Sequence, residues 1–178
     1  MKVMIVSDLH GSAYYTRKAL EIFQASSSDL LAILGDVYNH GPRNPLPQEY
    51  APMEVEELLN SIKDKLLVVK GNCDSEVDSM ISEFHFVESA ALMVGSNKVY
   101  LTHGHVFNKD NLPALSQGDT LIYGHFHQVI CEEVSGVHIL NPGSISLPKD
   151  GLRAYIMLDE KGASIFDLDG KELHRLDF

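Results

Sequence analysis

Near its start the chain reads Lys2-Val3-Met4-Ile5-Val6-Ser7-Asp8-Leu9-His10, an apolar run that ends in an acid and a histidine. The run is short and rich in β-branched residues, so we predict a buried strand over residues 2–6. Residues two apart in an extended segment point the same way, so Asp8 and His10 could both reach one metal ion. These residues alone leave a second interpretation open, in which Asp8 caps a helix and His10 lies at the surface.

Strands and helices alternate through the first part of the chain. Apolar runs at 30–34 and 66–69 predict two further strands, and residues 17–23 and 53–62 carry apolar side chains at helical spacing. This alternation predicts parallel strands joined by right-handed crossovers. Such sheets bind ligands at the carboxyl ends of their strands, where Asp8, Asp36 and Asn72 lie.

The second part of the chain is richer in strands. We predict them over residues 98–101, 120–123, 129–133, 137–140, 154–158, 163–167 and 173–176, with a hairpin turn at 159–162 and a Pro-rich loop at 41–47. We expect one domain over residues 1–178, in which two packed sheets carry helices on their outer faces.

Composition restricts the partners and the compartment. The net charge of −11 makes an extended nucleic acid an unexpected partner. The sequence has no apolar run long enough to span a membrane and no signal peptide, so we expect a cytoplasmic protein with no membrane contact. Two cysteines, Cys73 and Cys131, do not make a disulfide scaffold.

Two further ligand candidates follow glycines at predicted strand ends. Asp36 follows Gly35, and its two carboxylate oxygens are able to bridge two ions, although this segment alone favours an Asx-turn at a strand end. Asn72 follows Gly71, and its amide oxygen suits a hard metal, whereas Gly-Asn is also an ordinary turn. Each of these segments, taken alone, is a weak indication of a metal.

Histidines supply the rest of the series. His103 and His105 follow one predicted strand, and His125 and His127 follow the next at the same spacing. Imidazole suits zinc, iron, nickel and manganese. One such pair would carry little weight, but the ordered series Asp/His, Asp, Asn, His, His/His predicts a site for two metal ions.

The order and residue types resemble the calcineurin-like metallophosphoesterase superfamily. The segments that carry the resemblance are Asp8-Leu9-His10, Gly35-Asp36, Gly71-Asn72, His103-Gly104-His105 and Gly124-His125-Phe126-His127. The short chain, Gly71-Asn72-Cys73-Asp74 and Asn141-Pro142-Gly143-Ser144 are similar to the YfcE-type bacterial phosphodiesterase branch. The resemblance implies a four-layer α/β/β/α sandwich of two mixed sheets flanked by helices.

The resemblance also implies two divalent metal ions and a role for each ligand. One ion is assigned to Asp8, His10, Asp36 and His127, and the other to Asp36, Asn72, His103 and His125. Manganese is the metal implied, and zinc, iron, nickel or cobalt would also suit these ligands. A water or hydroxide that bridges the ions would attack a small phosphodiester, with Asp36, Asn72 and His103 as catalytic residues.

Two departures from the family pattern lie near these ligands. Many relatives have histidine where this chain has Cys73, and a neutral thiol is a poor acid, so we expect a dependence on leaving-group quality unless Cys73 merely packs. Many relatives have aspartate where this chain has Asn39. Asn39, His40, Arg43 and Cys73 are candidate substrate contacts, and Arg43 suits a phosphate, although it is equally an exposed loop charge.

The residues do not distinguish a phosphodiester from a phosphomonoester or a nucleotide. The diester prediction rests on the resemblance, which also implies a homodimer or a homotetramer. An interaction scaffold with little or no catalysis is an alternative of another class. Such scaffolds typically lose metal ligands, whereas every ligand position is filled here, so we predict a metal-dependent hydrolase of a small phosphorylated substrate.

Overall fold

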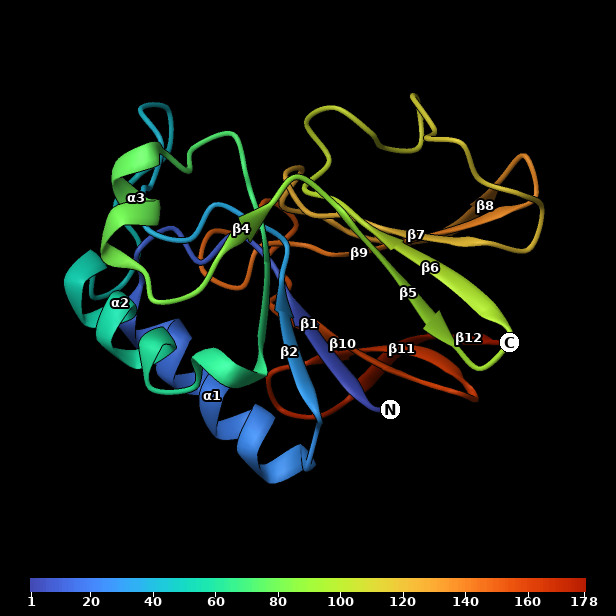
Figure 1. Cartoon of the computed structure of the whole chain (residues 1–178), viewed down its shortest axis with the longest axis horizontal. Coiled ribbons are helices and arrows are strands. Elements are labelled where there is room, and N and C mark those ends of the chain that lie inside the picture. The colour runs from blue at the N-terminus through green and yellow to red at the C-terminus, as the bar shows by residue number, and fades with distance from the viewer.

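The computed structural model describes residues 1–178 and contains two β-sheets packed face to face (Figure 1). The seven-stranded sheet has the order β12-β11-β10-β1-β2-β3-β4, and the five-stranded sheet has the order β5-β6-β7-β9-β8. The strands are β1 (Val3–Val6), β2 (Leu30–Ile33), β3 (Leu66–Val69), β4 (Phe86–Val87), β5 (Ala90–Val94), β6 (Asn97–Leu101), β7 (Thr120–Ile122), β8 (Val129–Val134), β9 (Val137–Pro142), β10 (Ala154–Asp159), β11 (Gly162–Asp167) and β12 (Glu172–Asp177).

Strand β1 lies in the middle of the larger sheet. Its residues, Val3–Val6, are completely buried. It pairs in parallel with β2, where Val3 lies opposite Leu30, and antiparallel with β10. Strand β3 continues the parallel part beyond β2. The predicted parallel order is therefore confirmed, and β1, β2 and β3 end at the same edge of the sheet.

Helices lie on one face of this sheet (Figure 1). They are α1 (Ala13–Ser26), α2 (Pro52–Asn60) and α3 (Glu76–Ile81), together with a single 3₁₀ turn, η1 (Lys63–Lys65). Helix α1 starts where the Ser12 hydroxyl accepts the Tyr15 N–H at 3.3 Å, which satisfies one free backbone donor of the first turn. Because side chains alternate along a strand, Met4 and Val6 face the helices while Val3 and Ile5 face the second sheet.

The second sheet closes the core on the other side. Val99, Leu101 and Ile122 pack against Val3 and Ile5 in the layer between the sheets. No helix covers the outer face of this sheet. Leu112 and Leu115, in the long loop between β6 and β7, pack on Leu121, Tyr123 and Ile139 instead, and this loop is the yellow-green to yellow segment above the sheet in Figure 1. The prediction of two mixed sheets is confirmed, with a loop as the outer cover of the second one.

Most predicted elements are present within a residue or two. Segment 41–47 is a loop without helix or strand, as predicted. Helix α1 is longer than the predicted 17–23, because its buried face begins earlier, at Ala13, and its last turn continues beyond Phe23, the last buried residue. The sequence analysis missed β4, β5 and α3. None of the helices is both long and apolar enough to cross a membrane.

Candidate metal centre

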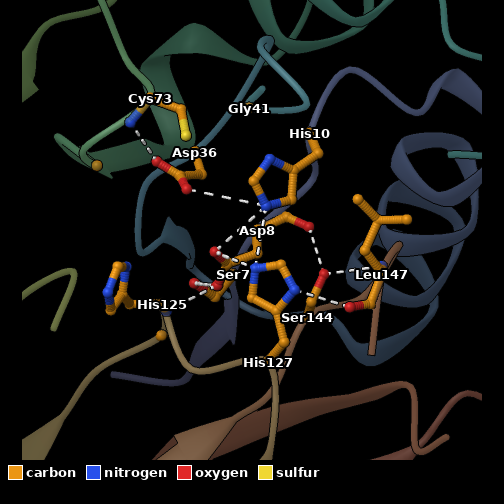
Figure 2. Close-up of polar contacts among 12 residues, drawn as sticks. Ser7, Asp8, His10, Asp36, Gly41, Cys73, His125, His127, Ser144 and Leu147 are labelled. Atoms are coloured by element: carbon orange, nitrogen blue, oxygen red, sulfur yellow. Dashed lines mark hydrogen bonds and ion pairs between the residues drawn. The ribbon is translucent and has the colours of Figure 1, made fainter. Parts of the chain in front are cut away.

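The predicted metal ligands converge at the carboxyl ends of strands from both sheets, and Figure 2 shows five of them, Asp8, His10, Asp36, His125 and His127. Asp8 follows β1, Asp36 follows β2 and Asn72 follows β3. His103 follows β6, while His125 and His127 follow β7. Segments far apart in the sequence thus meet at one end of the sandwich, and they form two groups of donor atoms.

The first group surrounds the buried Asp8 carboxylate. His127 Nε2 lies 3.2 Å and His10 Nε2 lies 3.6 Å from Asp8 Oδ1, and the two Nε2 atoms are 3.1 Å apart. Each ring binds a backbone carbonyl through its other nitrogen, His10 Nδ1 to Asn39 O and His127 Nδ1 to Leu147 O, both at 2.7 Å. A carbonyl only accepts, so Nδ1 carries the proton, and in the neutral ring the Nε2 lone pair points toward Asp8.

The second group surrounds His103, which is held in the same way. His103 Nδ1 donates to Leu34 O at 2.6 Å, so in the neutral ring Nε2 has a free lone pair. That Nε2 lies 3.0 Å from Asn72 Oδ1, 3.3 Å from His125 Nδ1 and 3.5 Å from Asp36 Oδ1. An amide oxygen, a carboxylate oxygen and two imidazole nitrogens therefore face one another.

The Asp36 carboxylate lies between the two groups. Its Oδ1 is 3.5 Å from His103 Nε2, and its Oδ2 is 3.8 Å from His10 Nε2. The Cys73 N–H also donates to Oδ1 at 2.8 Å, which fixes the orientation of the carboxylate. One oxygen is thus directed at each group of donors.

These residues fit divalent cations. Asp8 Oδ1 is buried and has no hydrogen-bond partner, although an unpaired buried carboxylate oxygen is costly. The donor atoms lie within 4.8 Å of one another in each of three sets, which are Asp8, His10 and His127; His10, Asp36 and Cys73; and Asp8, Asp36 and His103. Mixed oxygen and nitrogen donors of this kind suit manganese, iron, nickel, cobalt or zinc. A cation at each group would satisfy the lone pairs that no protein donor reaches.

Burial and neighbouring charges set the protonation of these groups. Burial would raise the pKa of Asp8, but His127, His103 and His10 outweigh it and bring the pKa to about 2. Burial lowers the pKa of His10, and it lowers that of His125 to about 4. Burial also opposes the charge on His127, but the nearby negative charge of Asp8 raises the pKa of that ring. Asp8 is therefore ionised, and His10 and His125 are neutral at pH 7.

Serine hydroxyls and one backbone N–H group hold Asp8 in place. The Ser7 hydroxyl donates to Asp8 Oδ2 at 2.5 Å, and the His125 N–H donates to the same oxygen at 3.0 Å. Ser144 and Ser146, from the segment after β9, both donate to the Asp8 carbonyl, at 2.8 and 2.9 Å. Asp8 is thereby fixed both at its side chain and at its backbone.

Asp74 performs the same task between β2 and β3. Its carboxylate accepts the N–H groups of Asp36 and Val37 at 2.8 Å and of Gly71 at 2.7 Å. The loops that carry Asp36 and Asn72 are thus tied to one carboxylate. Asp74 therefore orients its neighbours through their backbone N–H groups.

The backbone at the centre is strained. Asp8, His10, Asp36, His125 and His127 all have positive φ values, between 49° and 65°, a region that non-glycine residues seldom adopt. Strain of this kind persists where the surrounding structure enforces it, and it concentrates at functional sites. Five donor residues in this conformation therefore mark the site independently of residue type.

Close backbone approach explains two of the glycines. A Cβ at Gly71 would lie 2.2 Å from Asp36 Oδ1, and a Cβ at Gly124 would lie 1.8 Å from Ser7 Oγ. Both distances are far inside van der Waals contact, so only glycine fits without a shift. The glycines let segments with the donor residues touch.

The candidate substrate contacts separate into two kinds. Asn39, Arg43 and Cys73 line a cavity of about 660 Å³ that also contains Asp36 and His127. His40 is not among its lining residues, and its ring packs edge-on against Tyr50 at 5.2 Å. Burial, followed by the charge of Asp36, raises the pKa of Cys73 to about 12, so this thiol is neutral, as expected. His105 is exposed beside His103, with ring centres 5.4 Å apart, and makes no hydrogen bond.

Comparison with known proteins identifies the family. The model of the calcineurin-like phosphoesterase superfamily domain matches residues 1–163. The chain belongs to this superfamily. Phosphodiesterase YfcE of Escherichia coli K12 is 46% identical over 177 residues, covering 97% of this chain and 95% of the relative. The structure of YfcE, a phosphoesterase from E. coli, superposes with a TM-score of 0.95 at 44% identity over 99% of both chains.

A more distant structure shares the fold alone. Vacuolar protein sorting 29 from Cryptosporidium parvum has a TM-score of 0.65 at 23% identity, over 99% of this chain and 97% of that one. The family assignment, the donor groups and the phosphoesterase relatives together make this chain a metallophosphoesterase, as predicted.

Several residues of the site were not anticipated from the sequence. Ser7 and Ser146 bond Asp8, while Phe126 and Lys149 line the cavity. Asn141 was noted only as part of a similar segment, and its side chain donates to Gly124 O at 2.8 Å, which holds the turn before His125. Asn141 lies near the end of β9 and directly after the predicted apolar run 137–140, and a polar residue at such a position is the one signal that could have indicated this role.

Proposed function

We propose that the protein hydrolyses small phosphodiesters with two divalent metal ions. The proposal rests on one observation above the others, the division of the Asp36 carboxylate between two groups of donors. One ion would be held by Asp8, His10, Asp36 and His127, and the other by Asp36, Asn72, His103 and His125. When bound, the ions would supply Lewis acidity to the phosphate oxygens and lower the pKa of a water that bridges them, which makes it a nucleophile.

The protein's own residues would bind and orient the substrate. Arg43 lines the cavity without an ion-pair partner, so its guanidinium is available for a phosphate oxygen. Asn39 Oδ1 accepts the Gly41 N–H at 2.8 Å, which leaves its amide N–H groups available to donate. Cys73 would face the substrate as a neutral thiol and contribute little acid catalysis.

Support for the diester comes from the relative named phosphodiesterase YfcE, which is similar over nearly its full length. We propose manganese as the metal because of the resemblance to the YfcE-type branch. We also propose a single domain, a homodimer or homotetramer, and a cytoplasmic location, for which the two unpaired cysteines are the support.

The test compares two aryl phosphates. Metal-stripped protein is assayed on bis-p-nitrophenyl phosphate and on p-nitrophenyl phosphate, with and without Mn²⁺, beside the variant Asp36→Ala. We expect manganese-dependent release from the diester that the variant loses. Release from the monoester alone would leave the metal site intact but contradict the diester assignment. No release with any metal would favour an interaction scaffold.

A further inference from the structure

The cavity beside the donor groups has two walls of different chemistry. Its lining residues include Asn39, Arg43 and Cys73, which form the first wall, and Phe126 and Lys149, which are joined to His127 by sequence and by a backbone hydrogen bond and form the second. Figure 2 shows Cys73 and Gly41 on one side of the Asp8 and Asp36 carboxylates and His127 on the opposite side. A diester bound at the donor groups would therefore direct one ester arm to each wall.

Lys149 is attached to the centre through its backbone. Its N–H donates to the His127 carbonyl at 2.8 Å, and the His127 ring donates to the carbonyl of Leu147, two residues before Lys149. The position of the lysine is thus fixed by the same segment that orients a donor residue. Its exposed side chain lines the cavity.

The ammonium group of Lys149 has no counter-ion in the protein. It forms no ion pair, and its neighbour Asp150 is engaged elsewhere, accepting the Val129 N–H at 2.7 Å and the Leu152 N–H at 2.9 Å. Asp36 is the only carboxylate that lines the cavity, and it is buried. In a chain of net charge −11, this wall presents an unneutralised cation.

Phe126 adds an apolar surface to the same wall. The ring is half-exposed and is held nearly perpendicular to Tyr123 and His125, with ring centres 5.8 and 5.1 Å away. Such edge-to-face contacts fix the orientation of an aromatic ring. An apolar face and a free cation on one wall match an ester arm with a short apolar stem and an anionic end.

We infer that Phe126 and Lys149 bind the ester arm that is not cleaved, and that this arm carries an anionic group, a carboxylate or a phosphate. The inference rests on the proposed function, because it names the class of phosphodiester that the site takes. Lys149 is a specificity residue in this assignment, since it touches the retained arm and not the scissile bond. Hydrolysis itself is unchanged: water adds to phosphorus and the other ester oxygen leaves.

The first measurement is binding, which does not depend on turnover. Three phosphonates with a two-carbon spacer differ only in their far end: propylphosphonate, 3-phosphonopropionate and ethane-1,2-diphosphonate. Calorimetry with the manganese-loaded protein should show about fivefold tighter binding of at least one ligand with an anionic end than of propylphosphonate. The ligand preferred between those two distinguishes a carboxylate from a phosphate. Lys149→Gln should reduce the ratio to about one, and Lys149→Arg should keep it.

The second measurement uses two diesters with the same p-nitrophenol leaving group, one with a propyl arm and one with a 2-carboxyethyl arm. Wild-type kcat/KM should favour the charged arm about fivefold if the group is a carboxylate, and Lys149→Gln should lose this preference. Lys171→Gln is the matched control, because this exposed lysine lies in the turn between β11 and β12, outside the cavity, and should keep both rate and preference.

The outcomes separate the two proposals. Equal binding of the three phosphonates by the wild type, or a preference that survives in Lys149→Gln, overturns the inference, while hydrolysis of the propyl diester still supports the proposed function. A Lys149-dependent binding preference in a protein that hydrolyses neither diester supports the anionic subsite and overturns the phosphodiesterase proposal.

Discussion

His10 Nε2 lies 3.1 Å from His127 Nε2, and the Nδ1 atom of each ring donates to a backbone carbonyl. In their neutral forms the two rings therefore face each other with two lone pairs and no proton. The two lone pairs repel each other, and this repulsion is relieved only when one of the Nε2 atoms binds a proton or a metal ion. The contact between two rings 117 positions apart in sequence thus predicts how the protein responds to cations.

Metal binding should stabilise the fold. A cation present at 100 times its dissociation constant stabilises the folded state by about 2.7 kcal/mol, which in a chain of this length raises Tm by about 5–10 °C. Differential scanning fluorimetry of metal-stripped protein with added Mn²⁺ measures this shift. His10→Gln should lose more than half of it, whereas His174→Gln, an exposed histidine on β12, should keep it all. An equal shift in both variants would contradict the assignment of His10.

Gly71→Ala should destroy the centre by steric contact. The new Cβ would lie 2.2 Å from Asp36 Oδ1 and 2.4 Å from Asp36 N, so the carboxylate or its backbone must move. We expect at least a hundredfold loss of kcat/KM and no Mn²⁺-dependent rise in Tm, because small displacements of ligands are costly to a site.

The matched control is Gly95→Ala. This glycine has a positive φ of 62° in the turn between β5 and β6, and a Cβ there meets no atom within 4 Å. The variant should lose about 1 kcal/mol of stability from backbone strain and keep its activity. Comparable kinetics in the two variants would show that Asp36 tolerates displacement.

Cys73→His should help substrates with poor leaving groups. The thiol at this position is neutral and a weak acid, with a pKa raised to about 12 by burial and by Asp36, whereas an imidazolium can donate a proton at neutral pH. We expect kcat to rise about tenfold for an alkyl diester, less than the roughly 10²–10⁴-fold that an optimally placed general acid supplies, and to change little for a p-nitrophenyl ester. The measurement is the ratio of these two rates, and an unchanged ratio would mean that Cys73 only packs.

Much of the fold was predictable because strands of this chain carry strong local signals. Val3–Val6 is an uninterrupted apolar run, and a run of this kind signals a strand buried on both faces. Strand β5 was missed although Ala90 to Val94 is apolar throughout, because alanine, leucine and methionine favour a helix over a strand, and β4 was missed because two residues are too few to show a pattern. The sequence could not predict that the loop between β6 and β7 covers the second sheet, because this depends on long-range packing of Leu112 and Leu115 against residues in and beside β7 and β9.

The residues of the site likewise fall into a set that the sequence predicted and a set that it missed. The sequence predicted the donor residues because each follows an apolar strand and their order forms a family pattern. It missed the residues that support them, because those contacts join distant segments. Ser144 reaches the Asp8 carbonyl across 136 positions, and Lys149 is aligned by a carbonyl of His127. No local pattern encodes either contact. No local pattern encodes the Nδ1 tautomers of His10 and His127 either, because they depend on the carbonyls of Asn39 and Leu147.

Asp8 should make the metal-free protein sensitive to acid. Its pKa in the folded state is about 2, below the ordinary 3.8, because the neighbouring histidines outweigh the effect of its burial. A carboxyl group with a lowered folded-state pKa stabilises the protein above pH 3.8, and this contribution is lost as the pH falls from 3.8 toward 2. The shift corresponds to about 2 kcal/mol of unfolding free energy.

Urea unfolding of metal-stripped protein at several pH values between 2 and 6 measures this contribution. Between pH 5 and pH 2 the wild type should lose about 2 kcal/mol more than Asp8→Asn, since the amide does not titrate. Asp169→Asn, at an exposed position in the turn between β11 and β12, should follow the wild type. If the curves of wild type and Asp8→Asn run parallel, the histidines do not stabilise the Asp8 carboxylate in the absence of metal, and the acid sensitivity arises elsewhere.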